Sequence, residues 1–274
     1  MIALESPFDP SAVRPRERPG RAWVYGGGFV LALVAFGVAL EASGGALGNL
    51  GRALASGAVH AGFAGAGWVI AAGGGAPWGP ASRLAASLVL ASVAAWWSAW
   101  GALLYLLPPT LLVWEGRRFP VLSAVGLGAR PPLRYLPLGL VAGAFLGIHL
   151  LVSSSMTLGY SVRVGGLGVY LAAVAYDVGA NALTAEWLFR GALFSHWWRR
   201  WEFWPAAGLS TALVVCRYLL DPALPHAIEV RAGAVFYMLV LGLSACALRA
   251  ASGNLLPGYL ATTAFFAAYR TLAP

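Results

Sequence analysis

The sequence predicts an all-α protein, a bundle of about seven to eight transmembrane helices. Of its 274 residues, 59% are hydrophobic and only 10% are charged, whereas a soluble domain carries roughly 25% charged residues. Apolar stretches long enough to cross a bilayer core, which takes roughly 20 residues of helix, cover most of the chain. No even series of short alternating strands is present, so an outer-membrane barrel is not expected.

The chain begins with a tail that we expect to be basic and disordered. Residues 1–21 contain four prolines and four arginines. The apolar run that follows, from Trp23 to Leu40, is long for the core of a signal peptide. We therefore expect it to be a retained first membrane helix.

The other helices are predicted from apolar runs between arginines and turn residues, with tryptophans near their ends as interfacial anchors. The predicted spans are 22–42, 84–107, 135–156, 167–190, 204–220, 232–250 and 255–272. Small residues spaced four apart, Gly139, Gly143 and Gly147, would let another helix approach closely.

Residues 44–83 are harder to assign because they contain twelve glycines, which weaken a helix in water but are common in membrane helices. The tail 1–21 and the loop 114–134 each carry four arginines, so both should be cytoplasmic. An even number of crossings must therefore separate them, and spans 22–42 and 84–107 already supply two. We expect residues 44–83 to be an external or re-entrant segment, in an inner-membrane protein with a cytoplasmic N-terminus.

The net charge of +8 comes from arginine alone. These arginines lie mostly between apolar runs, where they set topology, so we expect a lipid bilayer rather than nucleic acid as the partner. Cys216 and Cys246 lie inside apolar segments and do not suggest a disulfide. The four histidines are scattered and no His-Glu-x-x-His occurs, so neither a metal nor another cofactor is expected.

Ionisable residues inside membrane spans are costly and are functional candidates by default. Glu186 and Arg190 stand four residues apart, which places them on one helix face with the acid N-terminal, the better orientation for pairing. They form either a site or a structural ion pair at a helix end. Asp177 begins a second polar stripe with Asn181 and Thr184, about 180° around the helix from Glu186, so the two acids cannot easily share one site.

The segment 184–194, Thr-Ala-Glu-Trp-Leu-Phe-Arg-Gly-Ala-Leu-Phe, resembles the first motif of the CAAX protease and bacteriocin-processing (CPBP) family of intramembrane proteases. That motif reads Glu-Glu-x-x-x-Arg, usually followed by Gly. Residues 125–140 resemble the basic linker and glycine-rich helix that often precede this domain, and residues 253–260 resemble the turn before its last motif. The resemblance implies a CPBP-like domain over 84–274, preceded by a first helix and glycine-rich segment over 22–83.

The expected catalytic groups of that family are replaced at the matching positions. The first Glu of the motif falls on Ala185, the second-motif His on Arg217, the third-motif His near Thr262, and its Asn on Phe266. The resemblance therefore implies either a pseudoprotease that binds such substrates or a glutamic-type endopeptidase with altered chemistry. Its substrates would be membrane-anchored protein or peptide tails, including C-terminal sorting signals.

For an active enzyme, the candidate catalytic residues are Glu186, Arg190, Arg217 and Cys216. A guanidinium cannot serve as a base, so Arg217 would hold an oxyanion or Glu186, or else pair with Asp221. Cys216 attacks only as a thiolate, which a neighbouring cation favours. The alternative from a different class is a non-catalytic scaffold or a permease subunit; convergence of Glu186, Arg190 and Arg217 on an internal cavity would favour the site.

Overall fold

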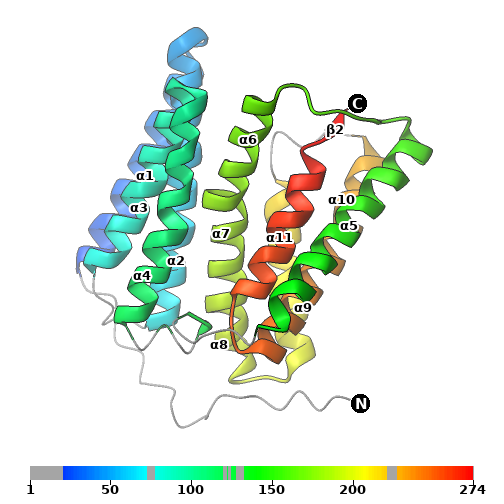
Figure 1. Ribbon diagram of the computed structural model, residues 1–274. Coiled ribbons are helices and arrows are strands. Elements are labelled where there is room, and N and C mark those ends of the chain that lie inside the picture. Colours follow the sequence, from blue (N-terminus) through cyan, green and yellow to red (C-terminus); the bar gives the residue numbers. More distant parts are fainter. Residues whose placement is uncertain are drawn as a thin grey trace.

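The computed structural model describes residues 21–72, 78–119, 122, 125–127, 133–220 and 227–273. The basic tail over residues 1–20, Arg130 and Asp221 lie outside them. The all-α prediction is confirmed, because the described chain is a bundle of helices with one short pair of strands (Figure 1). Within this part of the chain, five helices are long and apolar enough to cross a membrane. They are α1 (Arg21–Glu41), α2 (Gly45–Ala72), α5 (Tyr135–Leu158), the continuous α6–α8 helix (Leu167–Trp198) and α10 (Ile228–Ser252).

The expectation of an external or re-entrant segment over 44–83 is wrong, because α2 is one long helix across most of it. Its glycines lie where other helices come close. A Cβ at Gly51 would overlap the backbone of Gly37 in α1, and a Cβ at Gly67 would lie 2.5 Å from the indole nitrogen of Trp187. Small residues at such contacts let membrane helices pack closely, and this packing outweighs the weak helix propensity of glycine.

The predicted span 84–107 is also wrong, because a turn divides it. Helix α3 (Trp78–Trp97) ends before Ser98, whose side chain accepts a hydrogen bond from the Gly101 amide at 3.0 Å. The chain then reverses through η2 (Ala99–Leu106) and α4 (Leu107–Arg118). The start of α1 and the end of α4 therefore lie at the same end of the bundle (Figure 1), which keeps the even number of crossings that the arginines require.

The helices after residue 134 match the predicted spans within a few residues, except that 167–190 continues to residue 198. Besides α5, α6–α8 and α10 they include α9 (Phe203–Leu219) and α11 (Leu256–Tyr269). The predicted close approach at the α5 glycines is confirmed, since a Cβ at Gly139 or Gly143 would overlap the carbonyl of Pro257 or Ala261 in α11. Strands β1 (Ser161–Val162) and β2 (Leu272–Ala273), which follow the ends of α5 and α11, pair antiparallel.

The central helix runs as α6 (Leu167–Tyr176), η4 (Asp177–Asn181), α7 (Ala182–Ala185), η5 (Glu186–Phe194) and α8 (Ser195–Trp198). It lies between the N-terminal helices and the α5–α11 group (Figure 1), and most of its residues from 177 onward are buried. The η4 and η5 stretches are π-helical. Such wide turns are rare and often occur at functional sites. The fold thus shields the residues of η5 from lipid.

Candidate functional site

The predicted pair of Glu186 and Arg190 is confirmed as an ion pair. Arg190 Nε lies 3.8 Å from Glu186 Oε1, and both side chains are almost fully buried. The same carboxylate oxygen accepts a hydrogen bond of 2.8 Å from the Thr262 hydroxyl on α11. Two helices therefore fix Glu186, and the pair faces neither acyl chains nor bulk water.

The second oxygen of Glu186, Oε2, accepts no hydrogen bond from any residue that the structure describes. It points to the backbone of Gly258, where a Cβ would come within 3.0 Å of it. Gly258 on α11 therefore provides the room for this oxygen. A buried carboxylate oxygen without a donor is costly, and such atoms are candidates for contact with water or a ligand.

Arg190 extends away from Glu186 to the contact between α9 and α10. A Cβ at Gly242 would lie 2.9 Å from Arg190 Nη2 and 2.9 Å from Thr211 Oγ1. The neighbouring Ser210 donates to the Phe189 carbonyl at 2.7 Å. Helix α9 thus brings hydroxyl groups, rather than a histidine, close to the pair.

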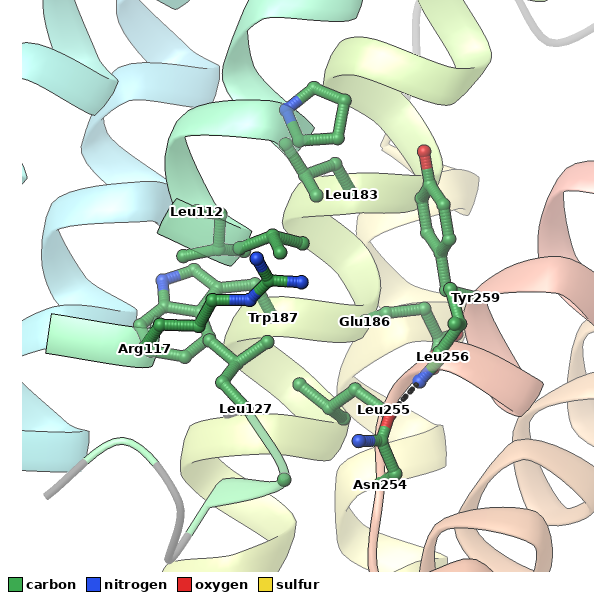
Figure 2. Close-up of a pocket in the computed structure, with 13 residues that line it drawn as sticks. Leu112, Arg117, Leu127, Leu183, Glu186, Trp187, Asn254, Leu255, Leu256 and Tyr259 are labelled. Atoms are coloured by element: carbon green, nitrogen blue, oxygen red, sulfur yellow. Dashed lines mark hydrogen bonds between the residues drawn. The ribbon is translucent and has the colours of Figure 1, made fainter. Parts of the chain in front are cut away.

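A pocket of about 570 Å³ opens beside Glu186, between α4, the central helix and the start of α11 (Figure 2). The lining residues at the floor of the pocket are buried, and several of those at its lip, the rim of its opening, are exposed. Its wall is mostly apolar, and Glu186 and Arg117 are the ionisable acid and base among the described lining residues, beside the polar groups of Asn254, Tyr259 and Trp187. The lining residues are Pro109, Leu112, Val113, Arg117, Gly126, Leu127, Leu183, Glu186, Trp187, Asn254, Leu255, Leu256 and Tyr259.

The structure does not bring Arg217 or Cys216 to this pair. The Arg217 guanidinium lies over the rings of Phe63 and Tyr218, 5.3 and 4.9 Å from their centroids. Cys216 is exposed on the outer side of α9, whereas the cysteine near Arg190 and Glu186 is the buried Cys246. The alternative pairing of Arg217 with Asp221 falls outside the described residues.

The three other residues at catalytic positions of the family motifs lie in different surroundings. Thr262 contacts Glu186 directly. Ala185 packs instead in a small apolar cluster with Leu188 and Val214. Phe266 packs against the ring of Tyr218, with centroids 5.4 Å apart.

Asp177 belongs to a different polar cluster, as its angular separation from Glu186 predicts. Arg270 donates two hydrogen bonds to its carboxylate, at 2.7 and 2.9 Å, and Asn181 donates a third at 3.0 Å. By accepting the two hydrogen bonds from the guanidinium, the Asp177 carboxylate raises the pKa of Arg270, which lies just beyond α11. Tyr218 completes the cluster by donating to Asn181 at 3.0 Å.

His60 is a buried partner of the central helix that no local sequence pattern indicates. Its Nδ1 lies 2.9 Å from Thr184 Oγ1 and its Nε2 lies 2.9 Å from the Tyr176 hydroxyl. Because Thr184 donates its proton to the Ala180 carbonyl, Nδ1 of His60 is the donor and Nε2 the acceptor. Both nitrogens are thus satisfied, and the histidine joins α2 to the central helix.

The fold and site together define a polytopic helical membrane protein with an acid–guanidinium pair buried beside an apolar pocket. Residues 167–265 match the family described as Type II CAAX prenyl endopeptidase Rce1-like. This segment contains Glu186, Arg190 and Thr262, and its match supports the resemblance of the chain to the CPBP family. No curated protein and no solved structure matches the chain.

Proposed function

We propose that this CAAX-protease-like membrane protein binds the C-terminal tails of membrane-anchored proteins in the pocket between α4 and α11. The observation that carries the proposal is the position of Glu186 on the wall of a mostly apolar pocket of about 570 Å³. Ligand sites of this size are typically apolar with a few placed polar groups. The match of residues 167–265 to the Rce1-like family of type II CAAX prenyl endopeptidases supports a tail as the ligand.

The arginine distribution supports the cytoplasmic side for this pocket. Arg117 lies in the last turn of α4, at the same end of the bundle as the start of α1. If the positive-inside rule sets the orientation, the pocket lies in the cytoplasmic half of the membrane. Tails of proteins anchored to the cytoplasmic leaflet would then reach it.

Binding is tested by filling the pocket with a bulky side chain at its exposed lip. Val113 lines the pocket and is 49% exposed, whereas Val152 on α5 is 52% exposed and does not line it. We expect Val113→Trp to weaken the binding of a fluorescent tail peptide to the purified chain at least about ten-fold. Val152→Trp should bind as the wild type does, and equal affinities for the two variants would refute the proposal.

A second candidate function, cleavage of the bound tail, is favoured by the unbonded Oε2 of Glu186. In this version Glu186 takes a proton from water, the hydroxide adds to the peptide carbonyl, and the proton passes to the leaving amine. The intact mass of a co-expressed tail-bearing protein would then fall with the wild type and not with Glu186→Gln. An unchanged mass with both proteins, together with tail binding, would identify a binding protein without protease activity.

A further inference from the structure

Arg117 is the one guanidinium among the described residues that line the pocket. It comes from the last turn of α4, and in Figure 2 it extends into the pocket from the wall that faces Glu186. Its neighbour Arg118 behaves differently, since its guanidinium stacks over the Trp114 ring, 4.4 Å from the centroid. Two adjacent arginines therefore have different surroundings, and one of them belongs to the pocket.

No described carboxylate pairs with Arg117. Within the described part of the chain, Arg117 makes neither an ion pair nor a hydrogen bond. The acid across the pocket, Glu186, is already held by Arg190 and Thr262. The pocket thus combines an apolar wall with a cation that pairs with none of the side chains that the structure describes.

We propose that Arg117 binds the free α-carboxylate at the end of the tail. This inference rests on the proposed function and names the end of the ligand that the pocket recognises. The planar guanidinium matches a carboxylate with two parallel hydrogen bonds, and an apolar wall strengthens the attraction relative to water. The residues before the carboxylate would then lie along the apolar wall toward Glu186.

A lipid headgroup phosphate offers the same pair of anionic oxygens. The pocket favours the peptide because its buried floor carries a second polar group, Glu186, beyond the reach of a headgroup at the surface. A tail carries backbone amides that can face that group along its length, whereas an acyl chain offers it no donor. The experiment below separates these two sources.

The test compares one tail peptide as the free acid and as the C-terminal amide, bound to the full chain in neutral detergent. We expect wild type to bind the acid at least about ten-fold more tightly than the amide. Arg117→Gln should reduce this ratio to about one, chiefly by weakening the binding of the acid. Arg118→Gln, the matched control, should keep the wild-type ratio.

Equal binding of acid and amide by the wild type would overturn the role of Arg117 and leave the tail-binding proposal intact. An equal loss of the ratio in Arg118→Gln would also overturn it, because the effect would then reflect surface charge. In nanodiscs, an Arg117→Gln effect confined to anionic lipids, with no change in the acid-to-amide ratio, would assign the residue to headgroups. If neither peptide binds, the proposed function itself fails.

Discussion

Glu186 and Arg190 are each buried almost completely, so each depends on the other for charge compensation. Removing one partner of a buried ion pair leaves an uncompensated charge and costs roughly 3–5 kcal/mol. Replacing both partners costs much less, because two desolvation penalties disappear together. The pair is therefore both a structural unit and the chemical centre of the proposed site.

Arg190→Met is expected to lower the thermal stability of the purified protein strongly, whereas Glu186→Gln/Arg190→Met should lower it less. The physical reason is that the double variant has no isolated charge left inside the bundle. Thermal unfolding in detergent measures the stability of the single and of the double variant. A double variant that is less stable than Arg190→Met would show that the two charges do not compensate each other.

Arg270 is expected to contribute to stability without contributing to ligand binding. Arg270→Gln removes the bidentate partner of Asp177, whose carboxylate is fully buried, so stability should fall by roughly 3 kcal/mol. The affinity for tail peptides should stay within about two-fold of the wild type, because this cluster does not line the pocket. A large loss of affinity at unchanged stability would contradict this division of roles.

At the residue scale, one contact could be predicted from the sequence and the others could not. The pairing of Glu186 with Arg190 follows from spacing within one helix, which needs no tertiary information. The contacts of Glu186 with Thr262 and of Arg217 with Phe63 join residues far apart in the chain. Their geometry depends on how the helices pack, which no local pattern specifies.

At the scale of single helices, glycine positions decide how closely the elements approach. Gly143 lies against the carbonyl of Ala261, whereas a Cβ at Gly208 in α9 would have no neighbour within 4 Å. A glycine-to-alanine substitution is therefore expected to have opposite effects on stability at the two positions.

Gly143→Ala is expected to destabilise the protein by roughly 1–3 kcal/mol, because α5 and α11 must move apart. Gly208→Ala should be neutral or stabilising by up to about 1 kcal/mol, since alanine restricts the unfolded chain. Denaturation of the two variants under identical conditions gives the comparison. Equal stabilities would mean that α5 and α11 do not pack at these glycines.

The glycine-rich stretch 44–83 shows why the helix α2 could not be predicted from local propensity. Helix propensities describe peptides in water, where glycine exposes backbone to solvent. In α2 the glycines instead lie against other helices, and a bilayer requires every backbone group to bond internally. Knowledge of the α1–α2 and α2–η5 contacts would have been needed to recognise one long helix.

At the scale of the whole molecule, the loop between α1 and α2 and the loop between α5 and α6 lie at one end of the bundle. The turn between α8 and α9 lies at the other end (Figure 1). In a variant lacking Cys216 and Cys246, cysteines placed at Ser43 or Gly165 should react with an impermeant maleimide added outside intact cells. A cysteine at Glu202 should react only after permeabilisation, and the reverse pattern would invert the proposed orientation.

The class of the whole molecule could be predicted from composition, and the resemblance of residues 167–265 to a known family from one short motif, because both are properties of the chain itself. The pocket could not be predicted. Its wall combines α4, the central helix and the start of α11, and α4 was not predicted as a separate helix. Arg117 therefore looked like one of several topology signals.

The central claim is that tails occupy the pocket beside Glu186, and site-specific photocrosslinking tests it most directly. A photoreactive amino acid at Val113 or Leu256, two exposed residues of the pocket lip, should crosslink to the C-terminal peptide of a co-expressed membrane-anchored protein. The same group at Met156, an exposed residue of α5 outside the pocket, should crosslink mainly to lipid. Tail crosslinks as frequent at Met156 as at Val113 and Leu256, or absent from all three, would contradict the account.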